Sequence, residues 1–568
     1  MIGRRNTREL QGGLRVGLVE TVRESVIGKD TAVATPFGLR RVTYADYTAS
    51  GRSLSMIEVF IRDQVLPLYA NTHTETSGTG LQTTRFREEA REIIRSSVGA
   101  SRDEHAVIFA GSGSTGAVDR LVGLLGIRIP GGLSKAYGLE DRIPVDERPV
   151  IFVGPYEHHS NELPWRESIA DVIEIKEDAD GHIDLVELES KLIEFDSRPM
   201  RIGSFSAASN VTGIISDTST ISHLLHAHGA LSFWDFAASA PYVEIEMGSA
   251  VAGDGVYNDA IFISPHKLIG GPGTPGVLVV RRDLLRNEVP VVPGGGTVQY
   301  VTTDHHSYIS DPEHREEGGT PAIIESIRAG LAFRLKETVG VETIRELEHG
   351  FIRRAIESWS ENPSIEILGN PKADRLSIVS FVIRHGAQTL HHNFVVALLN
   401  DLFGIQARGG CSCAGPYGHR LLGIDHETTL RLEDAVANGC EVIKPGWVRV
   451  NFNYFIAEEE FTYILEAVHL IADQGWRLLP LYRYDAGTAL WRHREGLPKP
   501  PASLTDIDFT TGEEMALPLT APVGELGAYL AEAKRILAEE PAAGGESPDL
   551  GSAVERLRWF PNPSEVET

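Results

Sequence analysis

The segment Ile263-Ser-Pro-His-Lys267-Leu-Ile-Gly-Gly-Pro-Gly-Thr-Pro-Gly276 sets a lysine between a short apolar run and a glycine-rich turn. The run Ala260–Ile263 has the length and composition of a buried strand. An isolated surface lysine does not follow such a strand directly, with a serine and a histidine beside it. Lys267 is therefore a candidate functional residue at the end of a strand, where α/β sheets bind their ligands.

Around this segment, strand-like and helix-like stretches alternate from Val42 to about Ile327. A helix is predicted by the apolar spacing from Ile221 to His228. Short apolar runs that end in turn-forming residues predict strands at Val107–Phe109, Val150–Val153, Ile202–Phe205 and Ala260–Ile263. This alternation predicts an α/β fold with a mostly parallel sheet covered on both faces.

Two other strand ends carry residues with a recognisable chemistry. Gly111-Ser-Gly-Ser-Thr-Gly116 follows one predicted strand and precedes a helical run, so backbone N–H groups and a helix N-terminus suit a phosphate there. Asp235 ends the apolar stretch Ala230–Trp234, where a carboxylate suits a protonated ring nitrogen. The structural alternatives are a generic strand–turn–helix connection for the glycines and a cap or buried hydrogen bond for the aspartate.

A phosphate, a protonated ring nitrogen and an aldehyde are the groups of pyridoxal 5′-phosphate. The glycine-rich turn suits the phosphate, Asp235 suits the nitrogen, and Lys267 suits the aldehyde, with which it forms a Schiff base. His158 and His159 offer a flat group to stack on the ring. A metal site at this histidine pair is the alternative, but no carboxylate or thiolate ligands stand nearby at helical spacing. The sequence predicts this cofactor and no metal.

The composition disfavours several classes of protein. A formal net charge of -26 repels phosphate backbones and anionic lipid, so we expect neither nucleic-acid nor membrane binding. No apolar run approaches the roughly 20 residues of a membrane span, and the basic N-terminus lacks the apolar stretch of a signal peptide. Three cysteines, Cys411, Cys413 and Cys440, cannot form a disulfide framework. We expect a cytoplasmic protein.

The length of 568 residues calls for more than one domain. We expect an N-terminal segment, 1–39, that packs as a helix on the small domain. A large cofactor-binding domain over 40–327 and a small α/β domain over 328–475 follow. The last part, 476–568, is expected to be a partly flexible extension, with a tail-like composition at Glu539–Ser547 and with Trp491 and Trp559 indicating some ordered packing.

Several motifs occur in a fixed order along the chain: Glu157-His-His-Ser-Asn161 with Pro164-Trp165, Ser209-Asn-Val-Thr-Gly213, Asp235, Ser264-Pro-His-Lys267, Gly318-Gly-Thr-Pro321 and Arg408-Gly-Gly-Cys-Ser-Cys413. Over roughly residues 40–470 this set resembles the class V aminotransferase superfamily of fold type I, and within it the cysteine desulfurase and selenocysteine lyase family. The resemblance implies a large domain with a sheet of the seven-stranded type, a smaller C-terminal α/β domain and a homodimer with its sites at the interface.

The resemblance also implies a role for each matching residue. Lys267 and His158 would be catalytic, with His158 stacking on the ring, and Asn210 would contact the cofactor's phenolic side or the substrate carboxylate. Arg449, with Arg408 nearby, would bind that carboxylate, since a guanidinium suits the planar group. The phosphate would be held by Ser114, Thr115, Ser264 and His266, and by Thr320 of the neighbouring subunit.

Cys413 decides which reaction is expected. In the desulfurase family a cysteine at this spacing after the arginine takes the sulfur of a small amino-acid substrate as a persulfide, and the thiolate is the nucleophile. The resemblance thus implies removal of sulfur from L-cysteine to give alanine, with a possible sulfur-acceptor protein. The sequence departs from the family pattern at two positions. Cys411 stands where one branch of the family carries histidine, and Ala238 stands where a glutamine is usual.

The residues leave several alternatives open at this point. Another class V reaction on a different amino acid, by an aminotransferase, an epimerase or a β-lyase, fits the same cofactor motifs. A non-enzymatic scaffold with this fold, or a structural, redox or metal-binding role of Cys411 and Cys413, is also compatible with the sequence, although three cysteines are too few for a four-cysteine zinc site. The nucleophile is Cys411 or Cys413, and the role of residues 476–568 is open.

Overall fold

The computed structural model describes residues 17–72, 74–496, 502–510, 518–539 and 544–566. The chain divides into two compact units. Unit 1 holds the chain up to Ile27, then Thr48–Leu347 and Lys372–Leu376, and unit 2 holds Gly28–Tyr47, Glu348–Pro371 and the chain from Ser377 onward. In the described ranges, no helix is long and apolar enough to cross a membrane.

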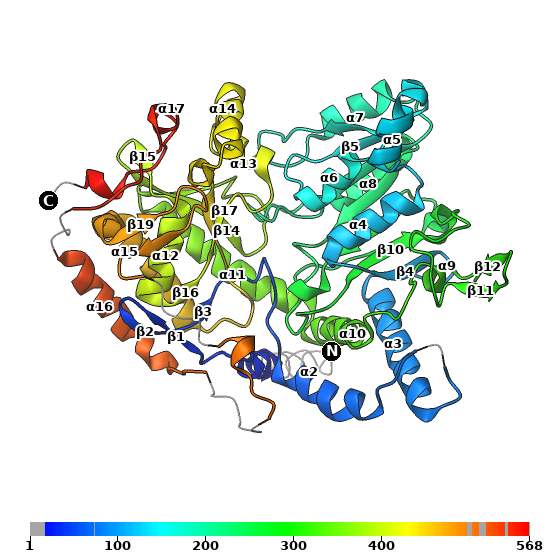
Figure 1. Cartoon of the computed structure of the whole chain (residues 1–568), viewed down its shortest axis with the longest axis horizontal. Helices are drawn as coiled ribbons and strands as arrows, with labels where there is room; N and C mark the ends of the chain where they lie inside the picture. The colour runs from blue at the N-terminus through cyan, green and yellow to red at the C-terminus, as the bar shows by residue number, and fades with distance from the viewer. Residues whose placement is uncertain (1–16, 73, 497–501, 511–517, 540–543, 567–568) are drawn as a thin grey trace, which may run out of the picture. The chain divides into compact units, whose positions relative to one another are not determined.

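Unit 1 is built on a seven-stranded sheet with the order β4-β10-β9-β8-β7-β5-β6 (Figure 1). Neighbouring strands from β6 to β9 are parallel, whereas β10 runs antiparallel to both β9 and β4. The mostly parallel α/β sheet predicted from the sequence is therefore confirmed. Its strands are β4 (His105–Ala110), β5 (Val150–Val153), β6 (Asp171–Glu174), β7 (Arg201–Ser206), β8 (Leu231–Asp235), β9 (Ala260–Ile263) and β10 (Gly276–Arg281).

Helix α4 (Gly113–Leu124) covers one face of this sheet beside β9 and β10 (Figure 1). Its buried residues Ala117, Val118 and Leu121 recur at helical spacing and share a core with Ile108, Phe262 and other strand residues. Every residue of β4, β5 and β9 is buried, as expected for strands covered on both faces.

The outer edge of β4 is closed by charged side chains, which we call the β4 charge ladder: Arg91, Arg95, Glu313 and Glu317. The N–H groups of Val107 and Phe109 each donate to a carboxylate, those of Glu313 and Glu317, at 2.7 Å. The carbonyls of His105 and Val107 accept from Arg95 and Arg91. The open edge of a strand can pair with a strand of another chain. Here the side chains of the ladder occupy the N–H and C=O groups of the edge, so such pairing is blocked.

Both arginines of this ladder lie on one long helix, which packs against a second long helix. Helix α3 (Gly78–Ser97) packs along α10 (Ile323–Val339). A Cβ on Gly330 of α10 would lie 2.6 Å from Ala90 of α3, so glycine allows the two helices to approach closely. Helix α10 confirms the helical pattern that the sequence shows from Ser326 to Val339.

Unit 2 is built on an antiparallel sheet with the order β13-β14-β18-β17, to which β15 adds beside β14. Helices α12 (His392–Phe403), α15 (Glu458–Gln474) and α16 (Leu526–Ala538) pack around it, with Phe394, Leu398 and Ile464 in the shared core. The strands are β13 (Ile365–Ile367), β14 (Ile378–His385), β15 (Gln388–Thr389), β17 (Arg408–Gly410) and β18 (Trp447–Asn451).

The N-terminal segment differs from the expectation of a helix packed on the small domain. Residues 17–25 are helical but belong to unit 1, where Val26 bridges to Leu54. Residues 28–47 belong to unit 2 and form the hairpin β1 (Ala32–Thr35) and β2 (Gly38–Arg41), followed by β3 (Thr43–Tyr44), which pairs with β16 (Ile405–Gln406). Alternating β-branched residues and a glycine turn favour strands here. Residues 1–16 lie outside the described ranges.

The described parts of the C-terminal extension belong to unit 2. Trp491 is buried in the unit 2 core and Trp559 packs against it. The tail-like stretch Glu539–Ser547 is described only at its two ends, since 540–543 lie outside the described ranges. The elements of the extension are β19 (Tyr482–Tyr484), β20 (Trp491–His493), α16 and α17 (Ser552–Glu555).

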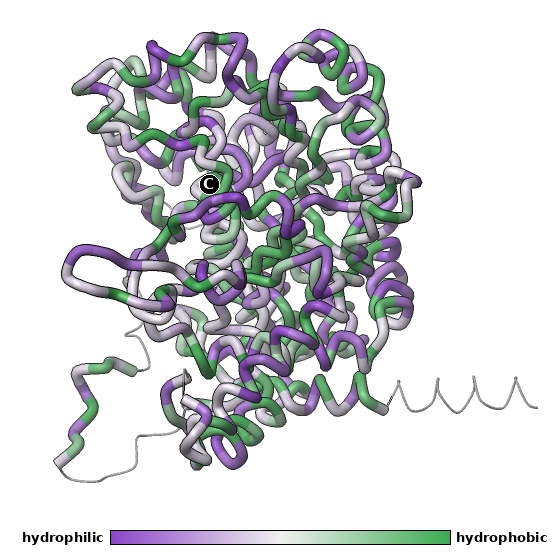
Figure 2. The backbone as a smooth tube through the Cα atoms, turned by 90° about the vertical axis from the view of Figure 1, so that its right-hand side faces the viewer, coloured by the Kyte–Doolittle hydropathy of each residue, from purple (hydrophilic) through white to green (hydrophobic). Residues whose placement is uncertain are grey.

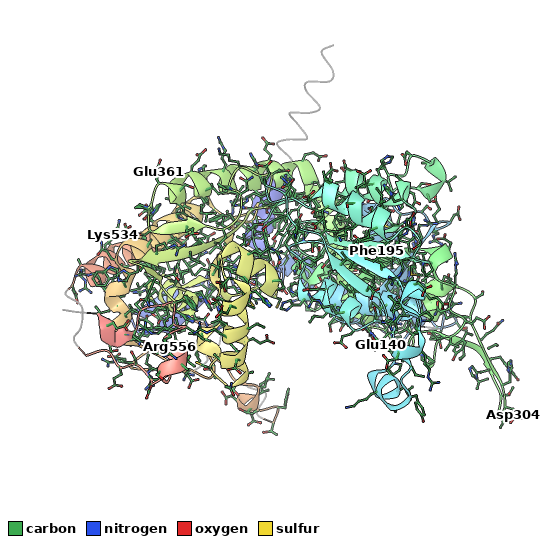
Figure 3. All side chains as sticks on the ribbon, turned by 90° about the horizontal axis from the view of Figure 1, so that it is seen from above. Glu140, Phe195, Asp304, Glu361, Lys534 and Arg556 are labelled. Carbon is green, nitrogen blue, oxygen red and sulfur yellow. The ribbon has the colours of Figure 1, made fainter. Side chains whose placement is uncertain are left out.

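The trace in Figure 2 alternates between hydrophobic and hydrophilic stretches, as expected for elements with one buried face. In unit 1 the hairpin of β11 (Val298–Val301) and β12 (His306–Tyr308) projects outward, with Asp304 at its tip (Figure 3). The other helices named in Figure 1 are α2 (Ser55–Phe60), α5 (Gly131–Tyr137), α6 (Leu163–Arg166), α7 (Leu185–Glu194), α8 (Thr218–Ala227), α9 (Pro312–Arg315), α11 (Val341–Ser360), α13 (Gly415–Leu421) and α14 (His426–Ala437).

Candidate active site

Lys267 lies in a short 3-10 turn, Pro265–Lys267, directly after β9. Its amide donates to Ser264 O at 3.0 Å, and its half-buried side chain interacts electrostatically with Asp235. The carbonyl of His266 accepts the amide of Gly51, and a side chain at position 51 would collide with Leu268 O. The backbone around the lysine is thus fixed on both sides.

Asp235 ends β8, the strand beside β9, and is 4% exposed. Its Oδ1 accepts the amide of Ala237 at 2.8 Å. Burial raises the pKa of Asp235, against the Ala237 amide, Lys267 and Ser114, which lower it. A buried carboxylate is stabilised by a cationic hydrogen-bond donor. The protonated nitrogen of a pyridine ring is such a donor.

The predicted phosphate loop lies between β4 and α4. Ser112, the N-cap of α4, makes no side-chain hydrogen bond to the helix, so its own hydroxyl does not occupy the first amides. The amide of Ser114 donates to Ser264 Oγ at 2.8 Å, which joins this loop to the Lys267 turn. Gly113 has a φ of 55°, and a Cβ on it would lie 2.9 Å from Ser264 Oγ. Glycine therefore keeps this loop open to an anion.

The other residues predicted to bind the phosphate differ in how far they are exposed to solvent. His266 lies beside Gly113, and burial together with the Lys267 charge lowers the pKa of its ring to about 4. Thr115 is exposed, with its Oγ1 2.6 Å from Ser160 Oγ. Thr320 is exposed, with its Oγ1 3.5 Å from Asn71 Nδ2.

His158 lies at the carboxyl end of β5, where its Nδ1 accepts the amide of Ser160 at 3.1 Å. This bond fixes the ring at the start of a short helical turn, 6.3 Å from the ring of His159. In the part of the chain that is described, no group of three or more His, Cys, Asp or Glu residues is placed to hold a metal ion. Asn210 is buried in the turn after β7, where Ser209 Oγ accepts the amides of Val211 and Thr212.

In unit 2 the two cysteines of the motif lie in a turn between β17 and α13. The amide of Ala414 donates to Cys411 O at 3.0 Å, and the two residues between them, Ser412 and Cys413, have φ values of 51° and 57°. We call Cys411–Ala414 the cysteine turn. Non-glycine residues with left-handed backbone are uncommon and cluster at functional sites. Cys411 is half-buried and Cys413 is exposed.

The two arginines predicted to bind a carboxylate lie side by side in unit 2, because Arg408 of β17 pairs with Arg449 of β18. Asp46 joins them: its Oδ1 lies 2.9 Å from Arg449 Nη2 and its Oδ2 lies 3.1 Å from Arg408 Nε. The Arg449 side chain is only 3% exposed, and burial lowers its pKa against the opposing effect of Asp46. The pair forms a cationic site beside the cysteine turn.

The sequence model of the Aminotransferase class-V family matches residues 43–444, which include both the phosphate loop and the cysteine turn. The chain belongs to the class-V aminotransferase family. Enzymes of this family use pyridoxal 5′-phosphate, and the buried acid, the half-buried lysine and the uncapped glycine loop of unit 1 fit that cofactor. This class-V chain is a pyridoxal-phosphate-dependent enzyme.

Relatives of this class-V enzyme share most of their length with it. A probable cysteine desulfurase of Halalkalibacterium halodurans is 29% identical over 418 residues, which cover 71% of this chain and 93% of the relative. Another from Pyrococcus abyssi is 26% identical over 387 residues, covering 67% and 87%. The apo cysteine desulfurase from Thermococcus onnurineus NA1 superposes with a TM-score of 0.60 at 25% identity, covering 76% and 95%. A cysteine desulfurase of Escherichia coli shares the fold, with a TM-score of 0.58 at 21% identity, covering 75% and 93%.

Two acidic residues of the class-V chain were not singled out from the sequence. Asp46 has no local motif that points to Arg408 and Arg449, which lie more than 300 positions away. Glu157 precedes His158 and is buried, accepting hydrogen bonds from Asn161 and from the amide and hydroxyl of Ser206. Burial raises the pKa of Glu157 to about 7 despite these bonds, and the charge of Asp235 adds to the rise. Its place in the Glu157–Asn161 motif was the available signal.

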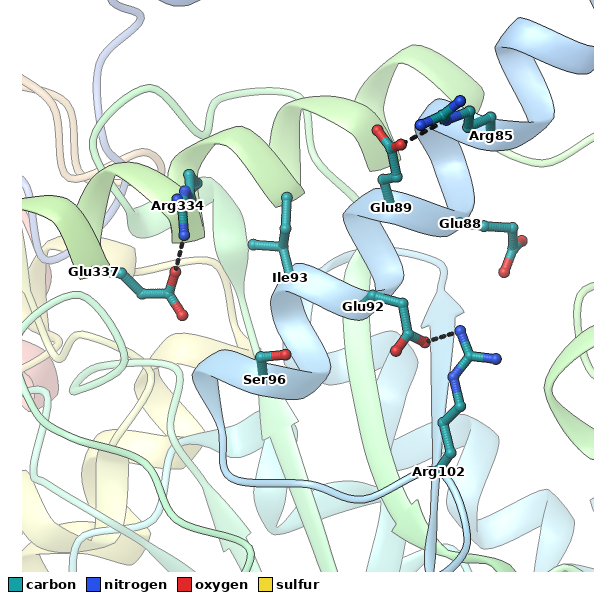
Figure 4. Close-up of a pocket in the computed structure, with 9 residues that line it drawn as sticks. All are labelled: Arg85, Glu88, Glu89, Glu92, Ile93, Ser96, Arg102, Arg334 and Glu337. Atoms are coloured by element: carbon teal, nitrogen blue, oxygen red, sulfur yellow. Dashed lines mark hydrogen bonds and ion pairs between the residues drawn. The ribbon is translucent and has the colours of Figure 1, made fainter.

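A hollow of about 520 Å³ lies elsewhere in unit 1, over α3 and α10 (Figure 4). Its charged residues neutralise one another within pairs. Arg102 lies 3.0 Å from Glu92 and Arg334 lies 3.4 Å from Glu337. None of the predicted site residues lines it. This hollow is a solvated, salt-bridged surface and not the site of the cofactor.

Proposed function

We propose that this enzyme is a cysteine desulfurase that transfers the sulfur of L-cysteine to Cys413 and releases alanine. The observation that carries the proposal is the position of Cys413. Its side chain is exposed in a turn with left-handed backbone, in the same unit as the Arg408–Arg449 pair. A sulfur acceptor must reach the nucleophile, and an exposed thiol meets that requirement.

The residues of unit 1 would hold the cofactor. The amides at the start of α4, with Ser114, Thr115, Ser264 and His266, would bind its phosphate, and Asp235 would keep its ring nitrogen protonated. His158 would lie over the ring and Asn210 at its edge. When bound through Lys267, the cofactor supplies an electron sink for the α-carbon of an amino acid.

The residues of the chain then have separate tasks. Arg449 binds the substrate carboxylate through its guanidinium, with Arg408 beside it. The Lys267 amine would take the proton of the substrate's α-carbon. Asp46 bridges the two guanidinium groups and orients them.

Cys413 carries out the sulfur transfer. Its thiolate forms an S–S bond to the substrate sulfur while the substrate's Cβ–S bond breaks, and the electron pair of that bond remains on the carbon side. The carbon takes up a proton and leaves as the methyl group of alanine, and Cys413 keeps the sulfur as a persulfide. A sulfur-acceptor protein or a thiol would then take the terminal sulfur.

The assembly and location belong to the same proposal. We propose a homodimer, in which Thr320 of each subunit reaches the phosphate of the other, because Thr320 is exposed at the end of the segment that carries the β4 charge ladder. The three cysteines are free in the structure, and persulfide chemistry needs a reducing compartment, so we place the enzyme in the cytoplasm.

The test is a panel of amino acids with separate measurements of sulfide, alanine and keto acid. We expect sulfide and alanine in equal amounts from L-cysteine under reducing conditions. C413A should lose both products, while C440A, which changes a half-buried cysteine away from the turn, should keep them. C411A distinguishes the two cysteines of the turn. Full sulfide release by C413A would overturn the persulfide mechanism, and keto-acid formation would favour another class V reaction.

A further inference from the structure

At Gly409, β17 packs against the first turn of α12 with no room for a side chain. A Cβ on Gly409 would lie 2.6 Å from Asn393 Oδ1 and 3.1 Å from His392 Cδ2. A Cβ on Gly446 would lie 2.8 Å from Gly410 Cα and 2.9 Å from His392 Cε1. The imidazole of His392 therefore lies directly behind Gly409 of β17 and beside Gly446, which itself packs against Gly410.

Two neighbouring rings hold this imidazole: that of His391 is tilted by 31°, and that of Trp559 is stacked. The ring of His392 lies 4.2 Å from that of His391 and 5.8 Å from that of Trp559, with an interplanar angle of 15° to the indole. Within the described ranges, no hydrogen bond reaches His392 Nδ1. Burial lowers the pKa of His392 to about 3, so the ring is neutral at physiological pH and has no charge to anchor it. Its orientation therefore depends on the stack.

Trp559 is itself fixed by the surrounding backbone. Its Nε1 donates to Ile443 O at 2.9 Å, and its carbonyl accepts the amide of Thr389 at 3.2 Å. The same C-terminal segment, residues 544–566, sends Val554 and Leu557 onto Leu432 of α14. Helix α14 follows α13, which begins at the far end of the cysteine turn. The segment thus supports both flanks of the turn.

We propose that Trp559 is a positioning residue for sulfur transfer: by stacking on His392 it fixes β17 and so sets the direction in which the cysteine turn presents Cys413. The proposal deepens the proposed function and rests on it. Residues 544–566 lie after the segment 43–444 that matches the family, so this support is an addition to the shared fold. Through Trp559 the C-terminal extension would affect sulfur transfer without touching the substrate.

The experiment compares W559A with W559F in the full-length enzyme loaded with pyridoxal phosphate. We expect W559A to lower kcat for alanine formation by about tenfold or more, because a small misplacement of a reacting group is costly, with KM changed by less than about twofold. W559F keeps a flat ring on His392 and should recover most of the wild-type kcat. The matched control is W476A, which removes a half-buried indole stacked on His385, also in unit 2.

A second measurement does not depend on turnover. The rate at which iodoacetamide labels Cys413, followed by mass spectrometry of the tryptic peptide, should change by about threefold or more in W559A and stay at the wild-type value in W559F and W476A. If wild-type enzyme forms no alanine from cysteine, the proposed function is wrong. The labelling comparison still tests whether Trp559 positions the cysteine turn.

Two outcomes overturn the proposal. The first is a W559A enzyme whose kcat and labelling rate both match those of W476A. The second is a fall in kcat with an unchanged labelling rate, since the defect would then lie elsewhere. If W559A is recovered in low yield, W559L, which keeps bulk but not the flat ring, is measured by the same criteria.

Discussion

Asp46 lies 2.9 Å from Arg449, a guanidinium that is 3% exposed, and the two residues are joined across more than 400 positions of sequence. The ion pair compensates a charge that would otherwise be buried alone. It also leaves the Asp46 carboxylate in contact with Arg408, which is half exposed. The arrangement orients two cationic groups for a substrate carboxylate.

Replacing Asp46 by Asn should therefore destabilise unit 2 and weaken substrate binding. Removing one partner of a buried ion pair costs about 3 kcal/mol or more in the free energy of unfolding. Urea unfolding and KM for L-cysteine measure the two effects. D63N, which breaks an ion pair with Arg62 at the surface, is the control and should leave both values unchanged. Equal stability of the two variants would contradict the role of Asp46.

Gly113→Ala should weaken cofactor binding. The added Cβ would lie 2.9 Å from Ser264 Oγ at a φ of 55°, inside the loop that suits the phosphate. We expect the Kd for pyridoxal phosphate, measured by absorbance titration, to rise by about tenfold or more. Gly126→Ala carries a similar backbone strain, with a φ of 67° and nothing within 4 Å of the new Cβ, and should keep the wild-type Kd. If both variants lose affinity for pyridoxal phosphate equally, backbone strain and not a clash in the phosphate loop would be the cause.

Asp235→Asn should retain the cofactor but lose activity. An amide does not hold the ring nitrogen in its protonated form, so the electron sink is weakened. We expect kcat to fall by about 100-fold or more while absorbance still reports bound cofactor. Asp217→Asn changes the carboxylate that caps α8 and should turn over normally. Normal turnover by D235N would show that this carboxylate is only structural.

Glu317→Gln should destabilise unit 1, because Glu317 pairs with the buried Arg87 and Arg91 and accepts the amide of Phe109. The two buried guanidinium groups would keep the more exposed Glu88 as a counter-charge, so the change should cost about 3 kcal/mol. Glu92→Gln, which removes a more exposed carboxylate on α3, should have a small effect. Chemical unfolding at neutral pH makes the comparison.

The same ladder gives a pH dependence with a defined sign. Burial opposes ionisation of Glu317, yet Arg91 and Arg87 outweigh it and lower its pKa from 4.5 to about 2. A depressed carboxyl pKa contributes stability that is complete above pH 4.5 and is lost as the pH falls towards 2. The free energy of unfolding should fall less steeply over this range in E317Q than in the wild-type enzyme. Parallel curves for the two proteins would be inconsistent with this origin.

Much of unit 1 could be predicted from the sequence because its signals are local. The strands before Lys267, Asp235 and the phosphate loop are short apolar runs, and strands that are buried on both faces require such runs. The connection from β4 to α4 needs glycine at Gly113 because of its positive φ. In the N-terminal segment, residues 28–39 do belong to unit 2, but not as a helix, because hairpin β1–β2 depends on partners that lie far along the chain, such as Thr520 opposite Thr31.

Local patterns along the chain predicted the main strands of unit 1, the glycine loop and the lysine that follows β9, since each depends on residues within one turn or strand. Which charges and rings meet is set by the folded chain. Asp46 reaches Arg449, Glu317 reaches Phe109, and Trp559 reaches His392 because packing brings distant segments together. Pairings across more than 150 positions leave no periodic trace in the chain, because their energy comes from burial and from complementary charge in the folded state.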